Sequence, residues 1–580
     1  MGEAGVVTDW LGRFEGALAS GDTQRLAGLF HADSHWRDVL AFGWRIDTLS
    51  GAGAIAEALA AAAPGAKPLG FVVDEARTPP RPVMRAGRDA VEAIFRFETT
   101  EGRGSGVLRL IDDKAWTVLT TLEELKGHEE RVGRARPTGE AYSRDFRGPN
   151  WFDQRQQAET YADHDPEVIV VGGGHAGLSI AARLAQLGID TLIVDREERI
   201  GDNWRKRYHA LVLHNQVHVN HLPYMPFPPT WPTYIPKDKL AGWFEAYVES
   251  LELNFWTRTE FEGGRYDERD GCWTVRLKRH DGSVREMRPR HVVLATGVSG
   301  IPNIPALPTL DAFEGTVLHS SRYEDGDAWR GKRALVIGTG NSAHDIAQDL
   351  QSSGAEATMV QRSPTMVVNV EPSAQLPYAL YEEGPSLEDC DLITVATPLA
   401  LGRKTHQILT EKAKGIDKKL LDGLEKAGFR LAFGDDGTGW QYLYLTRGGG
   451  YYFNVGCSDL LVEGKIGLRQ FADIERFTAD GALMRSGETI KADLIVLATG
   501  YKGQEELVTK LFGAEVTRRV GPIWGFGDGQ ELRNMFVATR QPGLWFIAGS
   551  LAQCRIYSKY LALQIKAREV GLIGDANPVT

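Results

Sequence analysis

The sequence is poor in cysteine, and the few cysteines lie far apart. The 580 residues include four, Cys272, Cys390, Cys457 and Cys554, and no two of them form a C-x-x-C pair. Scattered cysteines of this kind point to neither a disulfide framework nor a zinc site, and they fit a reducing compartment. The spacing also disfavours an enzyme that reduces disulfides through a cysteine pair.

Long apolar runs and basic clusters are missing as well. No apolar run approaches the roughly 18 residues of a membrane span, and the start, MGEAGVVTDWLGRFEG, lacks the basic and apolar regions of a signal peptide. The formal net charge is -11 and no Lys/Arg run is present, which disfavours a nucleic-acid partner. We therefore expect a cytoplasmic protein that binds neither nucleic acid nor membrane.

Length and composition are those of a folded protein with several domains. A chain of 580 residues is too long for one hydrophobic core, so about three domains are expected. The apolar fraction of 42% and the charged fraction of 25% are typical of globular proteins and disfavour extensive disorder.

Residues 1–125 read as a separate α+β unit. Apolar residues at helical spacing predict two initial helices, with Ser20 or Asp22 capping the second, and the later stretches AVEAIFRFETT and GSGVLRLI alternate as half-buried strands do. This order resembles the cone-shaped nuclear-transport-factor-like (NTF2-like, SnoaL-like) domains. The polar stretch 126–165 is expected to be a linker or wrapping segment.

Four residues of this unit are candidates for a second pocket, because related folds bind small molecules or catalyse there. The alternative for the unit is a structural role, in dimerisation or in covering the rest of the molecule. The four residues are His31, His35, Trp36 and Asp38.

A glycine-rich turn follows the linker. The apolar strand 168–171 leads directly into Gly172-x-Gly174-x-x-Gly177, and a helix is expected to continue to Leu187. Because the chain has 65 glycines, the glycine pattern alone is weak; the strand, the helix and Asp195 at the end of the next strand strengthen it. Such a turn directs a helix N-terminus at a pyrophosphate, and the aspartate accepts hydrogen bonds from a ribose.

A second turn of the same kind lies further along the chain, at Gly338-x-Gly340-x-x-Ala343. After its next strand come Gln361, Arg362 and Ser363, where a protein strict for NADH would usually carry an acid. A guanidinium at this position can bind a 2′-phosphate, so NADPH is favoured as hydride donor. Nothing there repels a free ribose hydroxyl, so use of NADH stays open.

Two further strands end alike, in Thr296-Gly297 and in Thr499-Gly500-Tyr501, where small residues allow the chain to cross between nucleotide domains. The fold class expected is α/β, a two-dinucleotide-binding (double Rossmann-like) flavoprotein with an N-terminal α+β domain. The predicted boundaries are 1–125 for the NTF2-like domain, 126–165 for the linker, 166–329 and 496–580 for the two parts of the FAD domain, and 330–495 for the NAD(P)H domain with an insertion.

One motif identifies a family. The pattern Phe313-x-Gly315-x-x-x-His319-x-x-x-Tyr323 is similar to the fingerprint of the flavin-containing monooxygenases, and the stretches RIGDNW, MPFPPTWPTY, GTGNSAHDIA and ATGY also match. The resemblance runs from about residue 168 to 569. Asp202 departs from the family, where many members have glycine. The histidine in the first turn and the N-terminal extension look most like the bacterial type II members, which include Baeyer–Villiger-active enzymes.

The resemblance implies a reaction. FAD is reduced by NADPH, reacts with oxygen to a C4a-(hydro)peroxyflavin and transfers one oxygen atom to a small ketone, by Baeyer–Villiger oxidation, or to a sulfide or amine. A flavin NAD(P)H oxidase that releases hydrogen peroxide is the first alternative. The second is a nucleotide-binding redox sensor whose N-terminal module is the working part. A homodimer is expected, as for most soluble enzymes.

The resemblance also assigns residues. The family's catalytic asparagine falls on Asn215, or on His214 if the segment is aligned without a gap. The fingerprint residues Phe313, Gly315, His319 and Tyr323 are expected to form a hinge, and a direct role of His319 as an acid or base is the less favoured alternative. The FAD set is Gly172, Gly174, His175, Ala176, Gly177, Asp195, Arg196, Asn203, Trp204, Gln216, Thr296 and Gly297. The NADP set is Gly338, Gly340, Asn341, Ser342, Arg362, Ser363, Thr499, Gly500 and Tyr501.

Two regions carry open alternatives. The cluster His209, His214, His218 and His221 has mixed spacings and no carboxylate partner, so no metal site is predicted there. The aromatic and glycine-rich stretch 434–454 is either a loop region that moves or lines a cavity, or a surface insertion with core aromatics.

Overall fold

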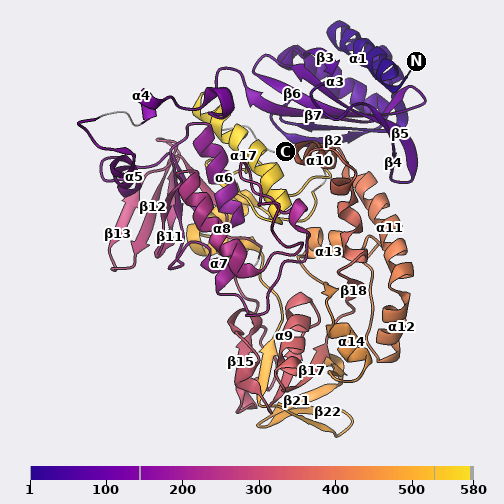
Figure 1. Cartoon of the computed structure of the whole chain (residues 1–580), viewed down its shortest axis with the longest axis vertical. Coiled ribbons are helices and arrows are strands. Elements are labelled where there is room, and N and C mark those ends of the chain that lie inside the picture. The colour runs from indigo at the N-terminus through magenta and orange to yellow at the C-terminus, as the bar shows by residue number, and fades with distance from the viewer. Residues whose placement is uncertain (1, 143–145, 299, 528, 575–580) are drawn as a thin grey trace.

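The computed structural model of the chain describes residues 2–142, 146–298, 300–527 and 529–574. Figure 1 shows an N-terminal unit at the upper right, a second sheet-and-helix unit at the left and a third at the bottom. No helix within the described ranges has the length and apolar character that a bilayer crossing requires.

The N-terminal unit is one curved sheet with helices on one face. The strand order is β2-β1-β7-β6-β5-β3, and β4 pairs with β5 as well. Asp22 caps α2 by accepting a hydrogen bond from the Arg25 amide, as its position before the helix predicts. The elements are α1 (Glu3–Ser20), α2 (Thr23–Gly28), β1 (Phe30–Val39), β2 (Ile46–Ser50), α3 (Ala52–Ala66), β3 (Leu69–Val73), β4 (Arg81–Arg85), β5 (Arg88–Glu98), β6 (Gly102–Ile111) and β7 (Lys114–Leu125).

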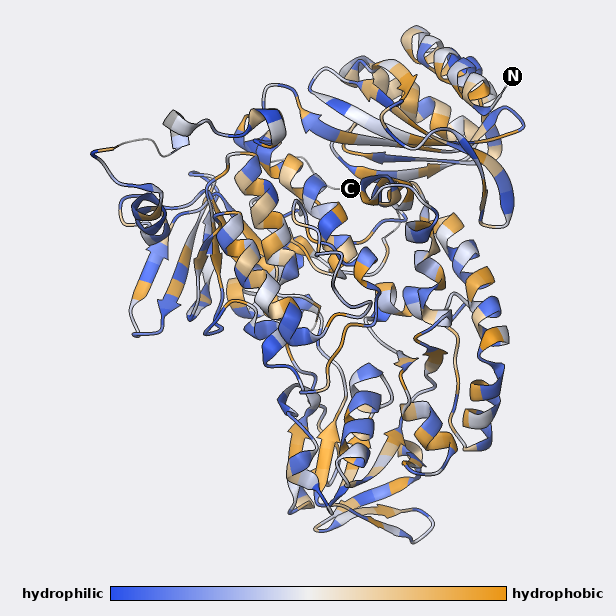
Figure 2. Cartoon of the chain, in the orientation of Figure 1, coloured by the Kyte–Doolittle hydropathy of each residue, from blue (hydrophilic) through white to orange (hydrophobic). Residues whose placement is uncertain are grey.

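The second unit holds the first glycine turn. Its five strands are all parallel, in the order β10-β9-β8-β14-β25, and their centres are apolar because both faces are covered, one by helices such as α6 and the other by an antiparallel sheet (Figure 2). An antiparallel sheet of β11, β12 and β13 is attached to it. The elements are α5 (Trp151–Thr160), β8 (Val168–Val171), α6 (His175–Gln186), β9 (Thr191–Val194), α7 (Asp202–Arg205), α8 (Lys237–Ser250), β10 (Asn254–Trp256), β11 (Thr259–Asp267), β12 (Cys272–Arg279), β13 (Val284–Met287), β14 (His291–Leu294), β25 (Leu544–Phe546) and α17 (Leu551–Glu569).

The third unit repeats the parallel plan around the second turn, in the order β15-β24-β16-β17-β20. Two small sheets, β18 with β19 and β21 to β23, complete it. The elements are β15 (Thr316–His319), β16 (Arg333–Ile337), α9 (Asn341–Ser352), β17 (Glu356–Gln361), β18 (Met366–Asn369), β19 (Tyr451–Asn454), α14 (Cys457–Val462), β20 (Gly467–Gln470), β21 (Ile474–Thr478), β22 (Gly481–Met484), β23 (Thr489–Lys491) and β24 (Leu494–Leu497).

An inserted helical segment runs between the third unit and the N-terminal sheet. It comprises η6 (Ser373–Glu382), α10 (Leu387–Val395), α11 (Leu399–Ile416), α12 (Lys418–Lys426) and α13 (Gly439–Arg447), and Figure 1 shows α11 and α12 along the right edge. Two short helices, α15 (Gln504–Phe512) and α16 (Ala514–Val520), follow β24.

The boundary predicted at residue 329 needs a correction. Strand β15 lies inside the range 166–329 that we predicted for the FAD domain, but it pairs with β24 and so belongs to the sheet of the second turn. Local sequence cannot reveal this, because a parallel strand is assigned to a sheet by partners far away in the chain.

The N-terminal sheet buries both of its faces. One face packs on α1 to α3 through a core that includes Trp10, Phe14 and Phe95. The other face packs on α10 and α17, where Val39, Leu119 and neighbouring residues meet apolar residues of those helices. The N-terminal unit is therefore built into the molecule through its second face.

The four candidate pocket residues of the N-terminal unit do not converge. Trp36 and Asp38 share the helix side of β1: the Trp36 indole donates to Thr120 Oγ1 (3.0 Å), which donates to Asp38 Oδ1 (2.6 Å). The His35 ring bonds Ser50 Oγ (2.8 Å), and the His31 ring bonds the Ile111 carbonyl (2.7 Å). These contacts support a structural role for the four side chains.

Asp38 predicts a pH dependence of stability. Burial raises the pKa of Asp38 to about 7, whereas an unfolded aspartate has a pKa of about 3.9. Between these values the folded state holds a proton that the unfolded state has lost, so the stability of the N-terminal unit should fall as pH rises from about 4 to about 7. Asp38→Asn should flatten this dependence in thermal unfolding.

The matched control is Asp33→Asn, because Asp33 lies on the same strand with its side chain 68% exposed. That variant should keep the wild-type slope. An unchanged slope in Asp38→Asn would contradict the assignment.

Candidate active site

Two glycines of the first turn are required by close contacts with the backbone. Gly172 has φ 107°, and a Cβ on it would lie 2.7 Å from the Ala295 carbonyl oxygen. A Cβ on Gly177 would lie 1.9 Å from the Gly172 carbonyl oxygen. The turn can therefore hold β8, β14 and α6 together only with glycine at these positions, and α6 begins within it, at His175.

The surroundings of this turn fit a bound nucleotide. Within the described chain, three buried polar atoms close to it have no hydrogen-bond partner: His175 Nδ1, Trp204 Nε1 and Thr296 Oγ1. Asp195 accepts hydrogen bonds from the Gly173 amide (2.6 Å) and the Glu197 amide (2.9 Å), and burial raises the pKa of its carboxyl group. Such donors, together with a carboxylate at the end of β9, suit the pyrophosphate, ribose and flavin of FAD.

The other members of the predicted FAD set differ in their positions: some have partners inside the protein, and Arg196 points into solvent. The Asn203 amide lies against Gly174, where a Cβ would be 2.8 Å from Nδ2. Gly297 accepts a hydrogen bond from Gln504 (2.9 Å), and the Gln216 amide contacts Glu371 (3.4 Å). The Arg196 side chain is 77% exposed, so it does not join the others.

The second turn repeats the first. Gly338 has φ 131°, and a Cβ there would lie 2.3 Å from the Ala498 carbonyl oxygen. Asn341 at the start of α9 accepts from the Phe453 amide (2.9 Å), which ties the turn to β19. The repeat extends to the neighbouring strand, because Ala295 and Ala498 both precede a Thr-Gly pair.

The phosphate end of the second site holds two arginines. Arg362 and Ser363 are exposed at the end of β17, and the Arg430 guanidinium donates to the Arg362 carbonyl (2.6 Å). The Gln361 side chain makes two hydrogen bonds to the Arg430 backbone: its oxygen accepts from the Arg430 amide (2.8 Å), and its nitrogen donates to the Arg430 carbonyl (2.9 Å). Arg430 was not predicted, since it lies 68 residues from Arg362 in sequence.

The two Ala-Thr-Gly strand ends lead into one crossing between the second and third units. The Asn303 amide donates to the Gly500 carbonyl (2.9 Å), and the Lys502 amide donates to the Ile301 carbonyl (2.9 Å). Thr499 Oγ1 donates to the Asn303 carbonyl (2.6 Å). Segments 301–303 and 499–502 thus form a short antiparallel link that carries the chain between the two nucleotide turns.

The fingerprint residues lie at this crossing. The His319 ring bonds the Gly500 carbonyl through Nε2 (3.0 Å) and accepts from the Ser321 amide at Nδ1 (3.1 Å). Tyr323 donates to Asp349 on α9 (2.7 Å), and the Phe313 ring covers Gly315. Because both ring nitrogens of His319 have local partners, the arrangement supports a structural role for His319 at the hinge over a role as a general acid or base.

Asn215 and His214 face different neighbours. The Asn215 amide donates to the hydroxyl of Tyr378 (3.1 Å), and burial raises the pKa of Tyr378 to about 12. The His214 ring packs edge-on against Phe453 (5.5 Å between centroids), and burial lowers its pKa, which keeps it neutral. The structure places Asn215 in a polar pair and His214 beside the second nucleotide turn.

A cavity of about 150 Å³ lies between the N-terminal sheet, α13 and α17. Its walls include Arg37 and Ile46 from the N-terminal unit, Tyr442 and Leu445 from α13, and Gln553 and Tyr557 from α17. The stretch 434–454 therefore supplies part of a cavity wall, as one alternative predicts, and it also places Trp440, Tyr452 and Phe453 in apolar cores, as the other predicts.

The cavity wall is joined to the first turn by hydrogen bonds. Gln553 Oε1 accepts from the Ser550 amide (3.1 Å) and from the Tyr444 hydroxyl (3.0 Å). The Gly549 carbonyl, one residue before Ser550, bonds the His175 ring (2.9 Å). The pattern Ser550-x-x-Gln553 is a capping box, so the sequence carried a signal for this helix start that we did not use.

No group of three or more His, Cys, Asp or Glu residues in the part of the chain that the structure describes could hold a metal ion. The four histidines of the 209–221 stretch have other neighbours; His221, for example, accepts from the Phe227 amide (2.9 Å).

Residues 169–383 match a family model described as pyridine nucleotide-disulphide oxidoreductase. Among curated proteins, the chain is 29% identical over 357 residues to indole-3-pyruvate monooxygenase YUCCA1 of Oryza sativa subsp. japonica, covering 60% of this chain and 79% of the relative. It is 31% identical over 339 residues to the probable indole-3-pyruvate monooxygenase YUCCA4 of Arabidopsis thaliana, covering 58% of this chain and 76% of the relative.

Solved structures share the fold. Cyclohexanone monooxygenase from Rhodococcus sp. Phi1 bound to NADP+ aligns with a TM-score of 0.51 and 18% identity, covering 70% of this chain and 85% of that chain. An oxidized steroid monooxygenase bound to NADP gives the same TM-score, identity and coverage. These structures confirm the predicted fold class of a two-dinucleotide-binding protein.

The paired arginines predict how the hydride donor is selected. Arg362→Ala and Arg430→Ala should each raise the KM for NADPH by about tenfold or more and change the KM for NADH much less, because charge-assisted hydrogen bonds to a 2′-phosphate are lost. Steady-state kinetics with both donors would measure this.

Arg476→Ala removes a 55% exposed arginine elsewhere in the same unit and should leave both constants unchanged. Equal effects on NADPH and NADH would rule out the 2′-phosphate assignment.

Proposed function

The chain belongs to the flavin-containing monooxygenase family, and on that premise we propose that it transfers one oxygen atom of O2 to a small organic ketone, sulfide or amine. FAD and NADPH are the cofactors typical of the family. The observation that supports the proposal best is the pair of glycine turns, each packed against an Ala-Thr-Gly strand end and joined by the 301–303 and 499–502 crossing.

Bound FAD would supply the redox chemistry, the acceptance of a hydride from NADPH and the activation of O2. The chain's own residues would bind the cofactor and shield the reacting atoms from water. The first turn, Asp195 and the unpartnered atoms of His175, Trp204 and Thr296 would hold the flavin nucleotide. The Asn215 amide, oriented by Tyr378, would donate a hydrogen bond at the reacting oxygen.

The cavity of about 150 Å³ suits the substrate. An apolar cavity of that size in another protein takes a benzene-sized molecule. The charges in its wall are paired: Arg37 bonds both oxygens of Glu531 (2.7 and 2.6 Å), so the cavity presents no uncompensated charge there. We expect neutral cyclic or aromatic substrates to be preferred to anionic ones, because a carboxylate would lose its hydration without gaining a partner.

A stopped-flow experiment tests the function. The FAD-loaded protein would be reduced anaerobically with NADPH and mixed with oxygen, with and without a cyclic ketone or a simple sulfide. Substrate-accelerated decay of the oxygen adduct, with one oxygenated product per NADPH, is expected. Direct return to oxidised flavin with stoichiometric hydrogen peroxide under every condition would favour the NADPH oxidase.

Asn215→Ala should leave the rate of flavin reduction by NADPH unchanged and raise the peroxide released per NADPH by about fivefold, as loss of one hydrogen bond predicts. His214→Ala is the comparison. This variant should release less peroxide per NADPH than Asn215→Ala, since the His214 ring faces the second turn. If His214→Ala leaks and Asn215→Ala does not, the two roles are reversed.

Leu445→Trp should raise the KM for a cyclic ketone by about tenfold, because it fills the cavity, without slowing reduction by NADPH. Leu445→Ala should enlarge the cavity and improve the relative rate with a bulkier ketone. An unchanged substrate profile in both variants would place the substrate elsewhere.

A further inference from the structure

We propose that the N-terminal unit positions the oxygen-transfer site through residues 371–396, which we call the strap. One end of the strap contacts the segment around Asn215, and the other end is held by charged residues of the N-terminal sheet. The inference rests on the proposed function, because it gives Asn215 and Tyr378 their role there.

The near end of the strap bonds three consecutive residues. Gln375 donates to the His214 carbonyl (2.9 Å), Asn215 donates to the Tyr378 hydroxyl (3.1 Å), and Gln216 donates to Glu371 (3.4 Å). Three contacts in a row from one segment mean that the placement of Asn215 depends on where the strap lies.

The strap has little local stability of its own at this end. Residues Ser373–Glu382 form a ten-residue 3-10 helix, η6, with Pro377 inside it. Runs of 3-10 helix longer than three or four residues are uncommon, because their hydrogen bonds are poorly aligned. A segment of this kind needs tertiary contacts to stay ordered.

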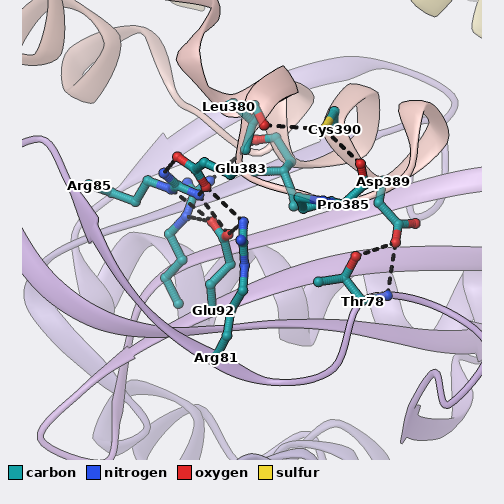
Figure 3. Close-up of polar contacts among 11 residues, drawn as sticks. Thr78, Arg81, Arg85, Glu92, Leu380, Glu383, Pro385, Asp389 and Cys390 are labelled. Atoms are coloured by element: carbon teal, nitrogen blue, oxygen red, sulfur yellow. Dashed lines mark hydrogen bonds and ion pairs between the residues drawn. The ribbon is translucent and has the colours of Figure 1, made fainter.

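The far end of the strap is held by the N-terminal unit (Figure 3). Glu383 accepts hydrogen bonds from Arg81 (3.0 Å) and from two nitrogens of Arg85 (2.9 and 3.0 Å). Both arginines also bond Glu92, whose side chain is 2% exposed. Asp389 accepts from the Thr78 amide (2.8 Å) and hydroxyl (2.5 Å).

Two buried arginines of the same sheet hold the C-terminal end of α10. Arg109 donates to the carbonyls of Ala396 (3.0 Å) and Ile393 (3.3 Å), and Arg37 donates to the Val395 carbonyl (2.7 Å). Positive charge at a helix C-terminus is favourable because the last carbonyls are unpaired and carry the negative end of the helix dipole.

A third anchor joins the strap to α17 and to the end of the Asn215 segment. Asp391 forms a two-pronged pair with Arg555 (2.8 and 2.7 Å) and accepts from the Tyr381 hydroxyl (2.8 Å). Arg555 donates in turn to the carbonyls of Val219 (2.7 Å) and His221 (2.8 Å). The strap thus bridges the N-terminal sheet and the site.

Removing the charge of Glu383 should loosen this bridge. In wild type three arginines, Arg81, Arg85 and Arg109, share the carboxylates of Glu92 and Glu383. In Glu383→Gln they would share that of Glu92 alone, so the repulsion among the guanidinium groups increases. The strap should then sample positions in which Tyr378 no longer holds Asn215. Flavin reduction, which depends on the two nucleotide turns and not on this contact, should be unaffected.

The first test measures the strap directly. Hydrogen–deuterium exchange of residues 373–382 in the FAD-loaded protein should be about threefold to tenfold faster in Glu383→Gln than in wild type. Glu124→Gln is the matched control: Glu124 pairs with Arg103 on the N-terminal unit and is 37% exposed, against 34% for Glu383. Unchanged exchange in Glu383→Gln would overturn the proposal whether or not the protein is a monooxygenase.

The second test is a double-mutant cycle on peroxide release. Glu383→Gln and Tyr378→Phe should each raise the peroxide per NADPH several-fold with unchanged flavin reduction, and the double variant should leak no more than Tyr378→Phe alone. Glu383→Asp should restore part of the coupling. Additive leakage would mean that Glu383 acts by another route and would overturn the positioning role.

The two ideas fail differently. If wild type oxygenates no substrate, the proposed function fails while faster exchange still supports the strap. Oxygenation by wild type with unchanged exchange in Glu383→Gln rejects the strap alone.

Discussion

Each nucleotide turn depends on one backbone contact, in which its first glycine lies against the carbonyl of an alanine at the end of the neighbouring strand. Gly172 meets Ala295 and Gly338 meets Ala498, and a methyl group on either glycine would lie within 2.7 Å of the facing oxygen. This approach leaves the Thr-Gly pair that follows each alanine directly beside its turn. The two chain segments then meet as 301–303 and 499–502, so the geometry of both nucleotide sites and of the crossing follows from the same contact.

The N-terminal unit is joined to this framework by charge as well as by apolar packing. Glu92, Glu383 and Glu531 face arginines of its sheet, and two of these arginines, Arg37 and Arg109, also donate to carbonyls at the end of α10. Burying a charge is costly unless it is paired and hydrogen-bonded, and here each of these groups has such partners. The result is a unit whose second face continues the core of the molecule and whose residues Arg37 and Ile46 line the cavity beside α13 and α17.

The parallel units could be predicted because their signals are local. An apolar strand, a glycine turn, a helix and a polar residue at the next strand end all fall within about 30 residues, so the flavin turn and the NADPH turn were identified from sequence. The fingerprint added the family. The predicted boundary at 329 was wrong for β15, because pairing with β24, nearly 180 residues away, decides which sheet that strand joins. Tyr378, Gln553 and Arg430 were missed as site residues, since an isolated tyrosine, glutamine or arginine has no distinguishing pattern.

The sequence by itself determined the fold class, the cofactors and the family, since glycines that must accept close backbone contacts and apolar parallel strands leave few alternatives. It also favoured Asn215 over His214 as the family's catalytic residue, without excluding His214. Only the tertiary structure set them apart, by directing one to Tyr378 and the other to Phe453. It alone placed the strap between the N-terminal sheet and that asparagine, because contacts between residues more than a hundred positions apart arise from the packing of whole units and leave no trace in local spacing.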